Sequence, residues 1–146
     1  MKQKNSEIVE NQIKVLFARK NFSGEDLADA RLQGLDFRGC LMGGVILDEA
    51  DLTGANMEGC ELYWSILFNT NFTRANLAHA KLNGASLDGA NFTNANLCGA
   101  DFGNYGSGRA TNLTGANFTN ATYDDTTVFP VNFDPISHKM VREIGI

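Results

Sequence analysis

The residues best suited to metal binding or nucleophilic chemistry are two histidines and three cysteines, and they form no recognisable site. His79 and His138 lie far apart, and neither has neighbours at metal-ligand spacing. No glycine-rich phosphate loop leads into a helix, and the acidic residues mostly occupy positions expected to face outward. We therefore expect a protein that is not an enzyme, with no catalytic residue, no cofactor and no metal site.

A five-residue repeat organises most of the chain. A large apolar residue recurs at every fifth position from Phe22 to Phe102, and a small residue precedes most of these central residues by two positions. This spacing matches neither the period of a helix nor that of a strand. An unbroken, non-helical period of this length is typical of a solenoid.

The period of five predicts a coil with four sides. An extended piece and a tight turn take about five residues, so four of them close a coil of about 20 residues. The central residue and the small residue before it would point inward, because a dense core leaves room only for a small neighbour. Glycines such as Gly54 and Gly89 follow the central residues by two, where a type II turn requires a positive φ. The central residues then fall on four faces: face one (Phe22, Met42, Leu62, Leu82, Phe102), face two (Leu27, Leu47, Leu67, Leu87), face three (Leu32, Leu52, Phe72, Phe92) and face four (Phe37, Met57, Leu77, Leu97).

Several segments carry the pattern A-(D/N)-(L/F)-x-x. They include ADLTG at Ala50–Gly54, ANLAH at Ala75–His79, ANFTN at Ala90–Asn94 and ANLCG at Ala95–Gly99. This pattern resembles the pentapeptide-repeat family over roughly residues 20 to 134. The resemblance implies an all-β solenoid, a right-handed quadrilateral β-helix, and says little about function because functions are added to this fold separately.

Cys40 and Cys60 each precede a face-one residue by two, so we expect them to stack in adjacent coils. Their Cα atoms would lie about 4.8 Å apart, within disulfide range. We interpret them as reduced, small core residues, with an oxidised pair as the alternative. Cys98 is expected to point outward, and a redox or metal role together with His79 is the minor alternative.

Both ends of the chain depart from the repeat. Val9, Ile13, Leu16 and Phe17 have helical spacing, so residues 1–20 are predicted to form an amphipathic helix that caps the solenoid. A partner-binding helix is the alternative. The solenoid is predicted to span residues 21–134. Residues 135–146 are predicted to form a tail or a short helix, with Ile136, Met140 and Ile144 on one side, or else a dimer contact.

The repeat is interrupted at residues 103–108 and resumes at Leu113, Phe118, Tyr123, Val128 and Phe133. The segments SLDGANFTNA and NLTGANFTNA, at residues 86–95 and 112–121, match at eight of ten positions and lie 26 apart. Because 26 is one coil of 20 plus six, we predict a six-residue loop at one corner. Phe118 would then stack on Phe92 of face three, together with columns of asparagine and threonine.

The composition limits the classes of function. A formal net charge of −5 argues against direct nucleic-acid binding. No apolar run approaches the ~20 residues of a membrane span, and the first residues lack the apolar core of a signal peptide. We therefore expect a cytoplasmic protein.

Two kinds of function remain. The preferred one is a non-catalytic interaction module, a rigid solenoid that presents a surface to an unidentified protein partner or to a second copy in a homodimer. The alternative is an acidic DNA mimic that acts on a DNA-binding protein such as DNA gyrase, because some pentapeptide-repeat proteins act in that way. An acidic cluster supports the alternative (Asp48, Glu49, Asp51, Glu58, Glu61). Residues 21–108 carry eleven acidic and four basic residues, a net charge of −7, which is about half that of duplex DNA of similar length.

One segment breaks the rule that outward positions are polar. In ELYWSILFN, at residues 61–69, four apolar residues fall on outward positions, and two more do so one coil earlier. We call these six residues the apolar patch (Leu41, Ile46, Tyr63, Trp64, Ile66, Phe68). We expect it to wrap the edge between faces one and two, with Tyr105 of the loop reaching toward it. Such patches usually mark interaction sites, and Trp and Tyr are common in hot spots. The alternative is that the loop or the N-terminal segment covers the patch.

Overall fold

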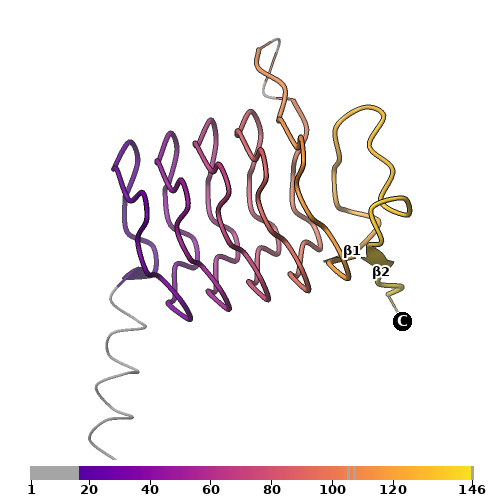
Figure 1. The fold of residues 1–146 in the computed structure, drawn as a ribbon, viewed down its shortest axis with the longest axis horizontal. Helices are drawn as coiled ribbons and strands as arrows, with labels where there is room; N and C mark the ends of the chain where they lie inside the picture. The colour runs from indigo at the N-terminus through magenta and orange to yellow at the C-terminus, as the bar shows by residue number, and fades with distance from the viewer. Residues whose placement is uncertain (1–16, 105, 107, 146) are drawn as a thin grey trace, which may run out of the picture.

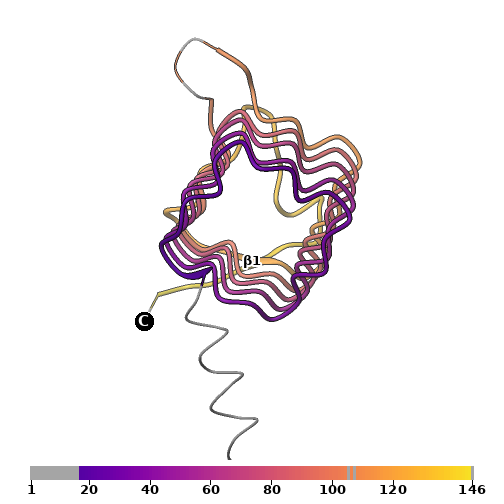
Figure 2. The ribbon, with the colours of Figure 1, turned by 90° about the vertical axis from the view of Figure 1, so that its left-hand side faces the viewer.

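The computed structural model describes residues 17–104, 106 and 108–145, and it shows coils stacked into a rod with a four-sided cross-section (Figures 1 and 2). Successive coils are parallel and in register, so that Asn21 pairs with Leu41, Leu41 with Glu61, and Glu61 with Lys81. On each side, neighbouring coils are joined by a β-bridge of a single residue, because a turn follows immediately. The predicted four-sided solenoid with a 20-residue coil is thereby confirmed.

Two continuous strands occur in the described part of the chain, and both lie at its C-terminal end. Strand β1 (Thr122–Tyr123) pairs in parallel with β2 (Val141–Arg142). β2 therefore continues the stacking of face four after the regular coils have ended.

The turns have the predicted geometry. In one example, Ala55 N donates to Leu52 O at 2.9 Å, and Gly54 between them has a φ of 66°. All the glycines in the predicted turn position have positive φ (Gly24, Gly34, Gly39, Gly54, Gly59, Gly84, Gly89, Gly99). Side chains at the same position, such as Trp64 and Asn69, take the same strained conformation.

The core is a column of inward side chains inside the rod. Every central residue from Phe37 to Phe102 is at most 1% exposed. Inward polar groups bond to the backbone: Thr70 Oγ1 donates to Leu47 O at 2.8 Å, and Ser65 Oγ donates to Leu62 O at 2.7 Å. Inward polar residues are therefore accommodated because their hydrogen bonds are satisfied.

The predicted six-residue insertion is confirmed. Ser86 pairs with Asn112 and Asn91 pairs with Asn117, which are separations of 26. The rings of Phe92 and Phe118 stack with centroids 4.9 Å apart and planes 7° apart. The loop leaves the rod at the corner between faces one and two, where Figure 2 shows it projecting.

The prediction that Val128 is a central residue is wrong. Val128 is 46% exposed and pairs with Asp101, a separation of 27, while the Phe129 ring stacks on Phe102 at 5.9 Å. The preceding turn is one residue longer than a regular turn. As a result, Thr127 takes the inward small position, and its Oγ1 donates to Leu97 O at 3.1 Å.

The segment after Phe129 closes the end of the rod instead of adding a regular coil. The Phe133 ring stacks on Phe129 with centroids 4.8 Å apart and lies edge-on to Phe118 with centroids 5.2 Å apart. Phe133 therefore covers the end of the core and does not continue face two. Met140 is buried, but Ile136 and Ile144 are 77% and 85% exposed. The structure places turns and β2 in residues 135–145, so the short helix with one apolar side is not formed there.

The predicted capping helix lies almost wholly outside the described residues. From Phe17 onward, the chain enters the first coil. The Phe17 ring packs against the rings of Phe22 and Phe37, with centroids 6.0 Å and 5.5 Å apart. Phe22 is only partly buried by the described residues, in contrast to its equivalents in later coils.

Candidate interaction surface

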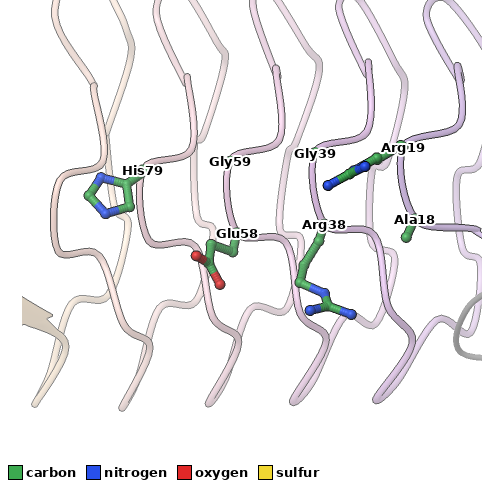
Figure 3. Close-up of a pocket in the computed structure, with 7 residues that line it drawn as sticks. All are labelled: Ala18, Arg19, Arg38, Gly39, Glu58, Gly59 and His79. Carbon is green, nitrogen blue, oxygen red and sulfur yellow. The ribbon is translucent and has the colours of Figure 1, made fainter.

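An open groove of about 640 Å³ follows the corner between faces four and one near the N-terminal end (Figure 3). Gly39 and Gly59 lie along it, and Arg19 extends over Gly39. Arg38 donates two hydrogen bonds to Asp36 through Nε at 2.9 Å and Nη2 at 2.6 Å. These bonds lower the pKa of the Asp36 carboxyl. The Arg38 guanidinium and the Asp36 carboxylate thus satisfy each other's hydrogen bonds.

The cysteines in the core are free thiols. Cys40 Sγ donates to Phe17 O and Cys60 Sγ donates to Phe37 O, each at 2.8 Å, and no disulfide joins them. Burial raises the pKa of Cys60 to about 12. The predicted position of Cys40 and Cys60 in the core is confirmed, and both are free thiols in the structure.

Cys98 is half-buried, and burial raises the pKa of its thiol. Its Sγ approaches Thr122 Oγ1 at 4.0 Å, while the ring of His79 lies against Gly99. Among residues 17–104, 106 and 108–145, no three His, Cys, Asp or Glu side chains are arranged to hold a metal ion.

The six residues of the apolar patch lie on the outside of the rod. Trp64, Leu41 and Phe68 are 47%, 42% and 38% exposed, and the other three are half-buried. Ile46 and Ile66 pair directly in adjacent coils and occupy the middle of face two. The turn after face one brings Tyr63 and Trp64 to one border of face two, and Phe68 lies at the opposite border.

The patch is therefore wider than expected: it crosses face two from corner to corner, with Leu41 on face one. Tyr105 lies outside the described residues. Tyr63 and Trp64 have further interactions within the chain. For this reason the case for a docking surface depends on Ile46, Ile66 and Phe68.

Trp64 lies next to the inserted loop. A Cβ atom added to Gly84 would be 2.5 Å from Trp64 Cδ1 and 3.3 Å from Arg109 O, so the indole covers Gly84 and the loop returns beside it. Trp64 has a φ of 54°, a conformation that costs a bulky side chain about 1–2 kcal/mol. The absence of a side chain at Gly84, one coil later, is thus what allows the indole to occupy this position.

Replacing Gly84 with Ala should destabilise the protein more than the same change at Gly54. Both residues have positive φ, but a Cβ on Gly54 would meet nothing within 4 Å. We expect about 1 kcal/mol for Gly54→Ala from backbone strain and about 1–3 kcal/mol more for Gly84→Ala from displacement of Trp64. Urea unfolding gives both values, and the emission of Trp64, the single tryptophan, should shift only in Gly84→Ala. Equal costs with unchanged emission would contradict this packing.

The anchoring of the inserted loop was not predicted. Gly84 N donates to Thr111 Oγ1 at 2.9 Å, and Thr111 Oγ1 donates to Leu82 O at 3.2 Å. Asn83 Nδ2 donates to Gly103 O at 3.3 Å, and the Arg109 guanidinium donates to Ser86 Oγ. These bonds hold both ends of the loop against the coil that follows the apolar patch. A threonine at the inward small position was the sequence signal for this anchor.

The five acidic residues grouped by sequence do not form one surface. Asp48 and Glu49 lie at the corner between faces two and three, and Asp51 lies on face three. Glu58 lies at the corner between faces four and one, and Glu61 lies on face one between Leu41 and Lys81. The five carboxylates are thus distributed over faces one and three and over two corners of the rod.

The family model for pentapeptide repeats matches residues 26–62 and 65–104 in eight copies, and these residues together make up more than half of the chain. No curated protein matches the chain. The chain is also similar to several solved structures, among them the following three. Rfr23 from the cyanobacterium Cyanothece 51142 is 26% identical, over 77% of this chain and 83% of that protein, with a TM-score of 0.49. The pentapeptide repeat protein alr5209 from Nostoc PCC 7120 is 29% identical, over 93% of this chain and 94% of that protein, with a TM-score of 0.35. The plasmid-mediated fluoroquinolone resistance protein QnrB1 is 20% identical, over 73% of this chain and 59% of that protein, with a TM-score of 0.42.

Within the described residues, no helix is long and apolar enough to cross a membrane.

Proposed function

Because the chain belongs to the pentapeptide-repeat family, whose members are in general structural or interaction modules, we propose that it is a non-catalytic interaction module that binds a protein partner through face two. The observation that carries this proposal is the apolar patch. Ile46 and Ile66 pair in the middle of face two, and Phe68 is 38% exposed at its border. Outward positions elsewhere on the regular coils are mostly polar, so apolar side chains here have no role in the core.

The rod suits such a role because its coils are joined mainly by backbone hydrogen bonds, to which the apolar outward side chains of face two do not contribute. The backbone is held by bonds between coils, such as Ile66 N to Val45 O at 2.9 Å and Leu67 N to Ser86 O at 2.8 Å. A rigid surface loses little conformational entropy on binding. Outward residues can therefore be replaced with little effect on folding while binding is changed.

The test replaces Ile66 and Phe68 with Ser in the full-length protein and compares chemical cross-linking to proteins from the native cells. We expect the cross-linked partner to be lost and the thermal melt to change little, because both side chains point outward. The matched control replaces Val131 and Ile136, which are 83% and 77% exposed at the C-terminal end, with Ser. The control should retain the partner. Equal capture by both variants would contradict the proposal, as would a loss of several kcal/mol of stability in the patch variant.

A further inference from the structure

Charge is segregated around the rod. The outward positions of face two and of the corner between faces two and three carry five acidic residues (Asp26, Asp29, Asp48, Glu49, Asp88). The described coils place no lysine or arginine at these positions. The one described cation that reaches this side is Arg109 of the loop, and its guanidinium donates to Ser86 Oγ.

The rest of the rod mixes the two signs of charge. Arg31 lies on face three beside Asp51, and Lys81 lies on face one between Glu61 and Asp101. Arg38 is bound to Asp36 beside the corner between faces four and one. Acidic residues outside face two and its corner thus tend to have a cation close by, whereas the one described cation on the side of face two is Arg109, at Ser86.

The acidic residues border the same apolar side chains that form the proposed binding surface. Along the corner between faces two and three, Asp48, Phe68 and Asp88 lie in successive coils, at about 4.8 Å per coil. Asp48 Oδ1 accepts a hydrogen bond from Phe68 N at 3.1 Å, which holds this carboxylate beside the Phe68 backbone. Ile46 and Ile66 lie next to this column, in the middle of face two.

We propose that face two binds a basic segment of a protein partner in which Lys or Arg alternates with aliphatic side chains. This inference depends on the proposed function and specifies the chemistry of the partner. The aliphatic side chains pack on Ile46, Ile66 and Phe68, and the cations pair with Asp48, Glu49 and Asp88. The apolar contacts supply most of the affinity, and the charges select the partner and raise the rate of association.

The test uses three fluorescent peptides and the full-length protein, with affinity measured by fluorescence anisotropy at low salt. The first probe alternates Lys with Leu, the second replaces each Lys with Glu, and the third replaces each Leu with Ser. The Lys/Leu probe should bind, the Glu/Leu probe should not, and the Lys/Ser probe should bind at least about tenfold more weakly because it lacks the apolar contacts. Raising the salt concentration should weaken binding of the first probe.

Two double variants with the same change in net charge locate the site. Asp48→Asn with Glu49→Gln removes charge beside face two, and the amide oxygen of the Asp48→Asn side chain can still accept the hydrogen bond from Phe68 N. Glu58→Gln with Glu61→Gln removes two charges from face one and from the corner between faces four and one. We expect the first variant to weaken binding of the Lys/Leu probe about tenfold and the second to leave it nearly unchanged.

Each other outcome overturns the inference. Equal weakening by the two variants would mean that the probe responds only to the net charge of the protein. Equal binding of the Lys/Leu and Glu/Leu probes would mean that the charges select nothing. No binding of any probe, while Ile66→Ser with Phe68→Ser still abolishes cross-linking, would leave the proposed function intact and reject the basic segment. A dimer in sedimentation equilibrium that is dissociated by that same patch variant would show that the occupant is a second copy.

Discussion

Replacing Phe92 with Ala should lower the free energy of unfolding by about 3–5 kcal/mol. Phe92 is fully buried, and its ring stacks on Phe72 at 5.0 Å and on Phe118 at 4.9 Å. It also lies edge-on to Phe102 at 6.1 Å. Removing it leaves a cavity in the centre of a stack whose coils are fixed at both sides and cannot close in. Urea unfolding at neutral pH measures the effect.

The matched control is Phe68→Ala, the same change at an outward position. Phe68 is 38% exposed and does not belong to the core, so its replacement should cost less than about 1 kcal/mol. Similar costs for the two variants would contradict the assignment of inward and outward positions, on which the apolar patch also depends.

The protein should lose stability at alkaline pH because of Cys60. The folded-state pKa of Cys60 is about 12, above its ordinary value of 9.0, because burial disfavours the thiolate. The folded protein therefore keeps a proton that the unfolded chain releases. The stability that this provides is complete below pH 9 and is lost as the pH rises toward 12, at about 1.4 kcal/mol per pH unit.

Cys60→Ala isolates this effect. Ala80 and Ala100 occupy the same inward column one and two coils later and are fully buried, so Ala fits this position. Between pH 9 and pH 10, in the presence of reductant, the wild-type protein should lose about 1 kcal/mol more than Cys60→Ala in urea unfolding, because the unfolded thiol is already half ionised at pH 9. The same loss in both proteins would show that Cys60 does not remain protonated in the folded state.

The regular part of the fold could be predicted from the sequence because each inward position admits one kind of side chain. A five-residue period, repeated without a break, fixes which residues point inward and therefore which coils stack. The same reasoning predicted the six-residue loop, because only that insertion places Phe118 on Phe92. It also placed Cys40 and Cys60 inside the rod, where the structure shows them as free thiols.

The C-terminal end could not be predicted in the same way, because there the repeat competes with local hydrogen bonds. Val128 and Phe129 are adjacent apolar residues, and the period alone selects Val128. Thr126 N donates to Asp124 Oδ1 at 2.9 Å and Thr127 Oγ1 donates to Leu97 O, so the turn takes one more residue and Phe129 becomes the inward one. The spacing of Ile136 and Met140 predicts a helix, although the chain there turns and enters β2.

The outward position of the six residues of the apolar patch could be predicted from the sequence, but the extent of the patch could not. Inward and outward positions follow from the period, so the exposure of Trp64 and Phe68 could be predicted. The segregation of charge could not be read from sequence neighbours, because Asp26, Asp48 and Asp88 come to lie on one side of the rod only when the coils stack. Grouping acidic residues by sequence instead gave a cluster that the structure distributes around the rod.

Photo-cross-linking from single positions tests the central claim, that face two is the binding surface, most directly. A photoreactive phenylalanine analogue replaces Phe68 in one variant and Asn94, an exposed turn residue at the corner between faces three and four, in the other. After illumination in the native cells, the claim predicts a defined cross-linked partner from position 68 and none from position 94. Cross-links of equal yield from both positions, or only from position 94, would contradict it.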